Sequence, residues 1–486
     1  MKEETSRPRH IAVIGGGLTG LAAAHRLMEL SRERGIPFDV TLFEAGPRLG
    51  GLVGTVERDG YLIDVGADSF ITNKPGAINL CRRLGLEDQL QETEPQYRGA
   101  LVLRDGRPLA VPEGFQLLSP TALWPVLASP ILSPWGKVRL AWEYFVPPRR
   151  DGSDEALASF VRRRFGAEVL DRLVQPLVAG IYTSDPEQLS LAATMPRFLD
   201  MEREHGSLIR AARAAKPTAI DDDRTSSGAR YGLFAGLRGG MKQLVDALAV
   251  RVRQGCRVEL GTEVTSVQLE ASASSRPVYR LQLRDTRTLT FDAVVITLPT
   301  YRAADLIDAF DSQLSSLLRA IDYASSLIVV SGHSLADIVD PLNAFGLVIP
   351  HCEHRRIIAV SFSSRKFPNR APTGRVLLRT FVGGAMQPEL FDLNDAAIRA
   401  LVLEELRDAL GVTGSPDFLE IYRYPRSMPQ YHLGHLDRVA EIERLSDRHA
   451  GFALAGNAYR GVGVPDAIAS GEEAAERIAN VITSAS

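Results

Sequence analysis

The stretch that most constrains the fold of this chain is residues 11–51. An apolar run at 11–14 leads into Gly15-Gly16-Gly17-Leu18-Thr19-Gly20, and a helical pattern follows to about Arg34. A second apolar run then ends at Glu44. A strand, a glycine-rich turn, a helix and a second strand in this order predict a βαβ unit that binds a dinucleotide.

The glycine spacing gives each position a separate task in such a unit. Gly15 allows the tight turn, Gly17 lets the backbone approach a pyrophosphate, and Gly20 lets the helix pack on the sheet. The helix N-terminus offers free N–H groups and a positive dipole end to the phosphates. The carboxylate of Glu44 can accept hydrogen bonds from both ribose hydroxyls. A glycine-rich structural turn without a ligand is the alternative.

The residues that follow Glu44 indicate which dinucleotide is bound. They read Ala45-Gly46-Pro47-Arg48-Leu49-Gly50-Gly51, which resembles the E-x-x-x-R-x-G-G extension of the flavin-containing amine oxidase, phytoene desaturase and porphyrinogen oxidase superfamily. The resemblance implies non-covalently bound FAD rather than NAD. It places Arg48 near the diphosphate, and lets the backbone at Gly50 and Gly51 pass close to the cofactor. A solvated loop arginine is the alternative for Arg48.

Composition and charge narrow the class of protein. The chain has 486 residues with 45% hydrophobic and 24% charged, which is enough for two or three globular domains. A net charge of −3 gives no electrostatic case for nucleic acid. Cys81, Cys256 and Cys352 have no metal-type spacing and fit a reducing cytoplasm. The polar first ten residues predict no secretory signal, and no apolar run predicts a transmembrane helix.

The order of predicted elements indicates a mixed α/β and α+β fold with discontinuous domains. A Rossmann-like FAD-binding domain is expected from 1–96, 231–298 and 440–486. An α+β substrate-binding domain is expected from 299–439, a helical insertion from 97–210, and a surface loop at 211–230. Within the insertion we expect one amphipathic helix from Glu155 to Arg172. The insertion also contains Trp124, Trp135 and Trp142. For most of the insertion we favour an ordinary helical core over a substrate mouth or an interfacial patch.

The C-terminal region predicts a second contact with the cofactor. A strand from Phe452 feeds a glycine-rich turn, and a helix then runs to Ile482. The N-terminus of this helix would point at the pyrimidine edge of the flavin and favour the negative charge of the reduced ring. The chain has no second G-x-G-x-x-G unit, which argues against a bound nicotinamide and for an oxidase or an external acceptor.

Several further stretches narrow the resemblance to one branch, the oxygen-dependent porphyrinogen oxidases of haem synthesis. They are Gly66-Ala67-Asp68-Ser69-Phe70, Pro176-Leu177-Val178-Ala179-Gly180-Ile181-Tyr182, Ser427-Met428-Pro429-Gln430-Tyr431-His432-Leu433-Gly434-His435, and Gly461-Val462-Gly463-Val464-Pro465-Asp466. Amine oxidases often carry a flavin-linking cysteine near the C-terminus, and no cysteine lies there in this chain.

This resemblance carries cofactor and substrate positions onto the chain. The implied FAD contacts are Gly15, Gly16, Gly17, Leu18, Thr19, Gly20, Glu44, Ala45, Arg48, Gly50, Gly51, Leu52, Gly66, Ala67, Asp68, Ser69, Val264, Asn457, Val462, Gly463 and Val464. The implied substrate contacts are Lys74, Arg98, Gly180, Phe345, Val348 and Phe381. For Val264, a plain core valine is an equally open interpretation.

One departure from the animal and plant enzymes bears on the substrate. Those enzymes carry an arginine that holds a propionate, and Ala100 occupies its place here, with Arg98 two positions out of register. The Gram-positive-like branch also lacks that arginine, and a lysine such as Lys74 takes its role. That branch is linked to coproporphyrinogen III, which is therefore the favoured substrate, with protoporphyrinogen IX as the alternative. More distant alternatives are another flavin amine oxidase or desaturase, or a tetrapyrrole-binding flavoprotein without catalysis.

The resemblance also implies a mechanism and partners. A substrate CH2 gives a hydride to flavin N5, O2 reoxidises the flavin to give H2O2, and three such cycles yield the porphyrin. No side chain is assigned as general base and no metal site is expected; His432 and His435 are interpreted as structural. The expected partners are the porphyrinogen, O2 and the next haem-pathway enzyme. The sequence predicts a cytoplasmic protein and leaves open peripheral membrane contact and whether it is a monomer or a dimer.

Overall fold

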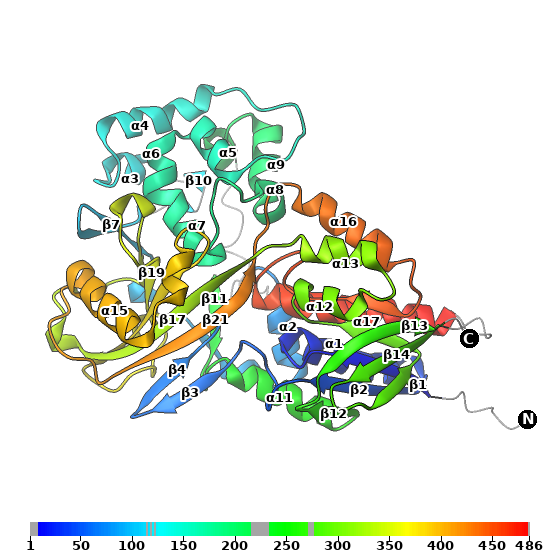
Figure 1. The fold of residues 1–486 in the computed structure, drawn as a ribbon. Coiled ribbons are helices and arrows are strands. Elements are labelled where there is room, and N and C mark those ends of the chain that lie inside the picture. Colours follow the sequence, from blue (N-terminus) through cyan, green and yellow to red (C-terminus); the bar gives the residue numbers. More distant parts are fainter. Residues whose placement is uncertain are drawn as a thin grey trace, which may run out of the picture.

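The computed structural model describes residues 8–112, 115–116, 119–120, 123–214, 233–270 and 277–484. Most of the predicted surface loop at 211–230 lies outside these residues. Its first four residues, however, belong to helix α10 (Leu208–Ala214). Figure 1 shows three parts: a parallel sheet with long helices at lower right, a larger sheet at lower left, and a group of helices at the top.

The first part is a five-stranded parallel sheet in the order β12-β2-β1-β16-β22. Its strands are β1 (Arg9–Ile14), β2 (Phe38–Glu44), β12 (Cys256–Leu260), β16 (Ala293–Ile296) and β22 (Phe452–Leu454). Helix α1 (Leu18–Arg34) connects β1 to β2. These strands come from distant parts of the chain, so the predicted Rossmann-like sheet of discontinuous segments is confirmed.

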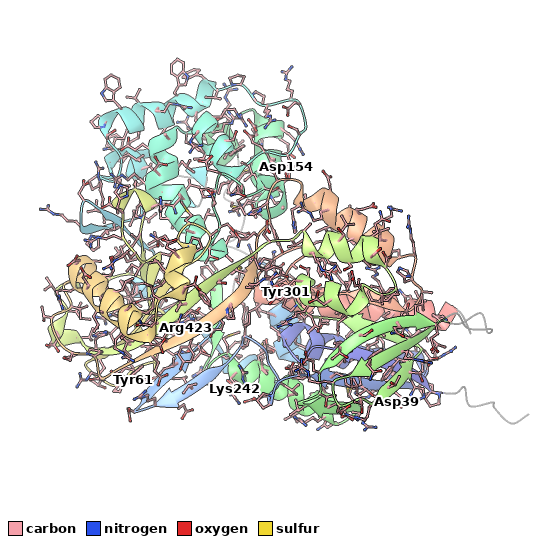
Figure 2. All side chains as sticks on the ribbon, in the orientation of Figure 1. Asp39, Tyr61, Asp154, Lys242, Tyr301 and Arg423 are labelled. Atoms are coloured by element: carbon pink, nitrogen blue, oxygen red, sulfur yellow. The ribbon has the colours of Figure 1, made fainter. Side chains whose placement is uncertain are left out.

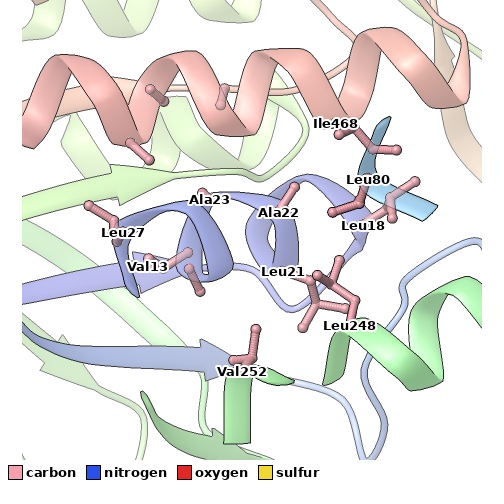
Figure 3. Packing of buried hydrophobic residues seen from close by; sticks show 14 of the residues in the cluster. Val13, Leu18, Leu21, Ala22, Ala23, Leu27, Leu80, Leu248, Val252 and Ile468 are labelled. Atoms are coloured by element: carbon pink, nitrogen blue, oxygen red, sulfur yellow. The ribbon is translucent and has the colours of Figure 1, made fainter. Parts of the chain in front are cut away.

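Helix α1 is buried between two other helices, α11 (Lys242–Arg253) and α17 (Val464–Ser484). Figure 3 shows the small side chains of Ala22 and Ala23 of α1 turned toward α17, and Leu21 turned toward Leu248 of α11. The contact with α17 is close: a Cβ added at Gly471 would lie 2.3 Å from the backbone oxygen of Thr19. Helix α2 (Gly76–Arg83) also packs on α17.

A three-stranded antiparallel sheet extends this part. It consists of β13 (Val264–Glu270), β14 (Val278–Leu283) and β15 (Thr288–Phe291). Helices α12 (Thr300–Ile307), α13 (Ser312–Arg319) and α16 (His435–Ser446) share one apolar core with it. The predicted domain boundaries at 298/299 and 439/440 therefore need correction, because the apolar faces of α12, α13 and α16 are buried against the nucleotide side.

The second part is a seven-stranded sheet in the order β21-β17-β20-β19-β18-β7-β8. Its strands are β21 (Phe418–Pro429), β17 (Tyr323–Ser334), β20 (Arg375–Gly383), β19 (Ala359–Phe362), β18 (Gly346–Val348), β7 (Leu101–Arg104) and β8 (Arg107–Ala110). The hairpin β7–β8 falls in the range 97–210 that was predicted as the helical insertion. It belongs to this sheet instead, because Leu101 and Val102 pair with Leu347 and Val348.

The two faces of this sheet are covered differently. Helix α15 (Asp395–Leu410) packs on one face. On the other face lies the hairpin of β3 (Thr55–Arg58) and β4 (Tyr61–Asp64), whose Tyr61 and Ile63 pack against Ile328 and Leu377. Tyr61, marked in Figure 2, also donates a hydrogen bond of 2.5 Å to Asp417. A small sheet of β5 (Phe70–Ile71), β11 (Phe234–Leu237) and β6 (Leu90–Glu92) lies between the parts.

The third part is helical. Its elements are α3 (Leu123–Ala128), α4 (Pro134–Ala141), η3 (Trp142–Phe145), α5 (Leu157–Arg164), α6 (Ala167–Val169), a π-helical turn (Leu170–Val174), α7 (Gln175–Tyr182), α8 (Leu191–Thr194), α9 (Pro196–His205) and α10, with a short strand pair β9 (Phe115–Gln116) and β10 (Ser119–Pro120). Asp154 joins this part to the start of α16, because it accepts hydrogen bonds from Ser190 (2.8 Å) and from the backbone of Gly434 (3.0 Å) (Figure 2).

The prediction of one helix from Glu155 to Arg172 is wrong. Helix α5 ends at Arg164, because Gly166 has a φ of +96° that no α-helix contains. Arg139 then donates hydrogen bonds to the backbone oxygens of residues 162–164 and so satisfies the free carbonyls of this helix end.

Candidate active site

The glycine turn after β1 has the geometry that a dinucleotide requires. A Cβ at Gly20 would lie 1.9 Å from the backbone oxygen of Gly15, so only glycine lets α1 start this close to the strand. Gly17 differs, because a Cβ there would have Gly51 at 4.0 Å as its nearest neighbour. The turn is therefore closed against the protein at Gly20 and open on the outside at Gly17, where a pyrophosphate would lie.

Glu44 is fixed beside this turn by the backbone. One carboxylate oxygen accepts a hydrogen bond of 2.7 Å from the N–H of Gly16, and the other accepts one of 2.7 Å from the N–H of Gly46. The backbone oxygen of Glu44 also accepts from the N–H of Thr262, two residues before Val264. The carboxylate thus lies at the C-terminal edge of the sheet, the place where parallel sheets bind nucleotides.

The loop after Glu44 folds back onto the glycine turn. The N–H of Gly50 donates to the backbone oxygen of Gly16 at 2.8 Å. The side chain of Arg48 donates to the backbone oxygens of Gly51 (2.8 Å) and Val53 (3.2 Å) within its own loop. The structure therefore gives Arg48 a role in shaping this loop, and its predicted place near the diphosphate stays a prediction.

Gly66 begins a second turn beside the first loop. A Cβ at Gly66 would lie 2.0 Å from the backbone oxygen of Leu52, so the two segments touch through backbone atoms. The predicted contacts Leu52, Ala67 and Ser69 lie on these segments, and Leu52 is half exposed. Val264 is buried in the core of β13–β15, which agrees with its alternative interpretation as a plain core valine, and its contact with FAD stays a prediction.

The C-terminal glycine loop is held by a residue that the sequence analysis did not single out. Tyr431 donates a hydrogen bond of 2.6 Å to the backbone oxygen of Asn457 and accepts one of 2.7 Å from the N–H of Gly461. Its ring stacks on His435 at 4.0 Å, and His435 donates to the backbone oxygen of Tyr459 at 3.0 Å. Burial lowers the pKa of His435 to about 4. His435 is therefore neutral near pH 7 and its Nε2 holds the loop, while its Nδ1 is buried without a hydrogen-bond partner among the described residues. Its interpretation as a structural residue stays a prediction.

The N-terminus of α17 follows this loop and carries Asp466. Asp466 accepts hydrogen bonds from the N–H of Gly463 (3.2 Å) and from Lys74 Nζ (2.6 Å). Lys74 was predicted as a cation for the substrate. The structure places its half-exposed side chain beside the predicted flavin end of α17, on the loop before α2.

Three of the predicted substrate residues lie together on one face of the seven-stranded sheet. Val348 and Phe381 both pair with Ala359, so they lie on the same face, on β18 and β20, with Ala359 of β19 between them. A Cβ at Gly180 of α7 would meet Val348 at 3.9 Å and no closer atom. Gly180 therefore leaves open space above this face.

The other two predicted substrate residues are less closely placed. Phe345 precedes β18 by one residue, and it is out of phase with Val348, so strand alternation does not place it on that face. Arg98 is exposed at the end of the 3-10 turn Pro95–Tyr97.

Two cations near the Gly66 turn were also missed by the sequence analysis. Arg379 and Lys366 both form ion pairs with Asp68, at 2.9 Å and 3.0 Å. The sequence of β20 did contain a signal for Arg379, because this charged residue follows the apolar run Val376-Leu377-Leu378 within one strand. By strand alternation Arg379 lies on the same face as Phe381. A charged residue in the middle of a buried strand normally has a buried partner.

Comparison with known proteins decides the family. The sequence profile of flavin containing amine oxidoreductases matches residues 18–479. The chain is 34% identical to the coproporphyrinogen III oxidase of Bacillus subtilis (strain 168) over 467 residues, covering 96% of this chain and 97% of the relative. The chain belongs to the flavin-containing amine oxidoreductase family. The predicted resemblance, the flavin cofactor and the oxidoreductase class are thereby confirmed.

Other members of this family show a similar extent of likeness. Protoporphyrinogen oxidase 2 of Arabidopsis thaliana is 29% identical, and the alignment covers 98% of this chain and 95% of the relative. A crystal structure from Exiguobacterium sp. 255-15, provisionally named a protoporphyrinogen oxidase, matches this structure with a TM-score of 0.85 at 28% identity. The match covers 98% of this chain and 99% of the Exiguobacterium chain. The likeness thus extends over the whole architecture rather than over the nucleotide sheet alone.

The described residues also bear on metal binding and on membrane crossing. Within these residues, no cluster of three or more His, Cys, Asp or Glu side chains is arranged to hold a metal ion. Within the same ranges, no helix combines the length and the apolar character needed to cross a membrane.

Proposed function

We propose that this protein oxidises a porphyrinogen to a porphyrin in haem biosynthesis, in three two-electron steps with bound FAD. O2 is the proposed acceptor and H2O2 the product. The main support is the meeting of two features: the face of Gly180, Val348 and Phe381, and the Gly66 turn, which Arg379 of the same face contacts. The names of the relatives, coproporphyrinogen III oxidase and protoporphyrinogen oxidase, agree with this proposal.

The residues present fit FAD at both ends of the cofactor. At the nucleotide end, the open side of Gly17 and the fixed carboxylate of Glu44 suit a pyrophosphate and a ribose. At the other end, the turn at Gly66 and the loop at Asn457–Gly461 suit a flat ring. When bound, FAD supplies hydride acceptance at flavin N5.

The protein orients the substrate and excludes water in this mechanism. The apolar side chains of Val348 and Phe381 form one wall for the flat macrocycle, and Gly180 leaves room where a larger side chain would obstruct it. Holding the macrocycle in one orientation turns the reaction into an intramolecular step, which is a large part of enzymatic rate enhancement. We assign no protein side chain as general base.

We propose coproporphyrinogen III as the preferred substrate. Ala100 stands where the animal and plant enzymes hold a propionate with arginine, and Lys74 is a cation with an exposed side chain near the proposed ring site. A substrate with four propionates gains more from such a rim cation than one with two. Lys74 would exchange its ion pair with Asp466 for a propionate on binding.

Side-by-side kinetics test this proposal. Anaerobically prepared coproporphyrinogen III and protoporphyrinogen IX are each mixed with the FAD-loaded protein in air, and porphyrin fluorescence is followed. We expect a higher kcat/KM for coproporphyrinogen III, and a raised KM with unchanged kcat in Lys74→Ala. A reversed preference would move the assignment to protoporphyrinogen IX, and equal kcat/KM values would contradict a preference for coproporphyrinogen III. Absence of turnover with both substrates would contradict the proposed function.

We also propose that the cytoplasmic protein contacts a lipid surface through its helical part. The helical insertion has a buried apolar core, but its tryptophans lie outside that core. Trp124 is 79% exposed, Trp135 82% and Trp142 60%, and Phe145 beside them is 66% exposed. Tryptophan is suited to the membrane interface because its ring is both apolar and polar. These residues lie on α3, α4 and η3, so the exposed aromatic side chains all belong to the helical part.

Vesicle co-sedimentation tests this second proposal. We expect the wild type to sediment with vesicles of mixed zwitterionic and anionic lipid, and the double variant Trp135→Ser/Trp142→Ser to remain in the supernatant. Val250→Ser is a matched control, because Val250 is also exposed but lies on α11. Equal sedimentation of the wild type and the double variant would contradict the proposal.

A further inference from the structure

The turn of residues 65–69 is held from outside by the seven-stranded sheet. Tyr424 of β21 donates a hydrogen bond of 2.6 Å to the backbone oxygen of Val65. Arg379 of β20 donates to the backbone oxygen of Gly66. These contacts join residues more than 300 positions apart in the sequence. The shape of the turn therefore depends on the sheet that carries the proposed substrate wall.

Asp68 is the centre of an ion cluster on this turn. Its carboxylate lies 2.9 Å from Nη1 of Arg379 and 3.0 Å from Nζ of Lys366, and Ser69 donates to it at 2.8 Å. Lys366 also donates to Ser69 at 2.7 Å. Burial alone would raise the pKa of Asp68, but the two cations and these hydrogen bonds hold it well below its usual range. Asp68 is therefore an anion, and the turn is fixed at both its backbone and its side chains.

Arg379 joins the turn to the substrate wall. Its side chain is only 3% exposed, and its guanidinium lies over the ring of Phe381 at 5.5 Å. Its Nε is buried without a hydrogen-bond partner among the described residues. A buried guanidinium that keeps one N–H unpaired retains positive potential for a further acceptor.

The cluster carries an excess of positive charge. Two cations, Arg379 and Lys366, face one carboxylate, Asp68, so one positive charge remains uncompensated. The neighbouring pair of Arg370 and Asp64, at 3.5 Å, brings one charge of each sign. In a buried site the potential of such a charge is screened weakly and acts on any anion formed nearby.

We propose that Arg379 is a positioning residue for the flavin ring, fixing the Gly66–Ser69 turn and supplying the positive charge that favours the anionic reduced ring. The inference rests on the proposed function in one respect, that this turn lies against the isoalloxazine ring. It assigns to a residue of the substrate sheet a direct influence on the redox properties of the cofactor.

The midpoint potential of bound FAD tests this inference without any porphyrinogen. The FAD-loaded wild type, Arg379→Lys and Arg379→Met are titrated anaerobically with dithionite against a reference dye. In Arg379→Met we expect the ratio of reduced to oxidised flavin at a fixed ambient potential to fall about tenfold, which is about 30 mV for a two-electron couple. Arg379→Lys keeps the charge and is expected to remain near the wild type.

Arg375→Met is the matched control. Arg375 lies on the same strand, four residues away, with a side chain 41% exposed and paired with Asp417 at 3.1 Å. Its removal is expected to leave the potential unchanged. A potential in Arg379→Met equal to those of the wild type and Arg375→Met would overturn the inference.

A second variant decides the matter if Arg379→Met does not retain FAD. Asp68→Asn leaves both cations and removes their counter-charge, so we expect a more positive potential than in the wild type. An unchanged or more negative potential in Asp68→Asn would overturn the inference. Failure of the proposed function is seen separately, as a wild type that binds FAD but does not oxidise porphyrinogens, and it leaves the potentials of the variants to be judged by themselves.

Discussion

The two turns that meet the proposed cofactor are built in different ways. The first, at Gly15–Gly20, is shaped by its own backbone, by the carboxylate of Glu44 and by the hydroxyl of Thr297, which follows β16 of the same nucleotide sheet. The second, at Gly66–Ser69, is shaped by side chains of Tyr424, Arg379 and Lys366. The first turn is therefore independent of the substrate side of the molecule, whereas the second is part of it. Variants of the two turns should differ accordingly.

The largest effect is expected at the first turn. A Cβ in Gly20→Ala would meet the rigid backbone oxygen of Gly15 at 1.9 Å, so α1 must shift away from the sheet. We expect FAD affinity to fall more than about a hundredfold, with a lower Tm of the apoprotein. Gly17→Ala is the matched control, because its Cβ has open space: the apoprotein should keep the wild-type Tm and lose affinity only. Equal Tm values for Gly20→Ala and the wild type would contradict this account.

A smaller effect is expected from pH on the free energy of unfolding. Two histidines allow the C-terminal glycine loop, beside His435, to be distinguished from the seven-stranded sheet, which contains His333. Burial lowers the pKa of both His435 and His333 to about 4. Because the unfolded chain takes up these protons more readily, stability is fully present above about pH 6.5 and is lost as pH falls toward 4. For each histidine we expect a loss of about 2 kcal/mol in the free energy of unfolding at about pH 5.

Denaturant unfolding at several pH values checks this prediction. His435→Gln should remove the share of the pH dependence that belongs to the C-terminal loop, and His333→Gln the share of the substrate sheet. A pH dependence between about 7 and 5 that is the same in both variants and in the wild type would show that neither histidine is neutral by burial.

A substitution in the substrate wall should change substrate binding without changing FAD binding at the first turn. Gly180→Leu fills the space above Val348, and we expect the KM for coproporphyrinogen III to rise about tenfold, with FAD content unchanged. Gly180→Ala is the control, because its Cβ would make only an ordinary contact of 3.9 Å. Substrate kinetics with parallel flavin absorbance decide the point. An unchanged KM in Gly180→Leu would remove Gly180 from the proposed site.

The smallest effect is expected at Tyr431. Tyr431→Phe removes its hydrogen bonds with Asn457 and Gly461 and should cost about 1 kcal/mol, seen as a roughly fivefold weaker FAD affinity. Tyr301→Phe is the control, since the hydroxyl of Tyr301 makes only a long hydrogen bond of 3.4 Å to Arg426. Equal affinities in both variants would mean that the loop keeps its shape without Tyr431.

The same contrast explains what the sequence could predict. The βαβ unit and Glu44 were predictable because their residues lie close in sequence and their spacing follows from strand and helix periodicity. The place of hairpin β7–β8 was not predictable, because its pairing with β18 joins Leu101 to Leu347, 246 residues further along the chain. Arg379 was missed for the same reason, because its partner Gly66 lies 313 residues away in the chain. The role of Tyr431 was missed although Asn457 and Gly461 follow 26 and 30 residues later, because no periodic pattern marks a tyrosine whose hydroxyl binds the backbone of a loop.

Reduction of bound flavin in the absence of oxygen tests the central claim most directly. FAD-loaded protein is mixed anaerobically with coproporphyrinogen III, and flavin absorbance and porphyrin fluorescence are recorded together. We expect rapid loss of the oxidised flavin spectrum before air is admitted, because each flavin takes up two electrons from the porphyrinogen. On admission of air we expect the flavin spectrum to recover and porphyrin fluorescence to grow, because O2 reoxidises the flavin for the second and third steps. Flavin that stays oxidised with this porphyrinogen and with protoporphyrinogen IX, but is bleached by an amine, would contradict it.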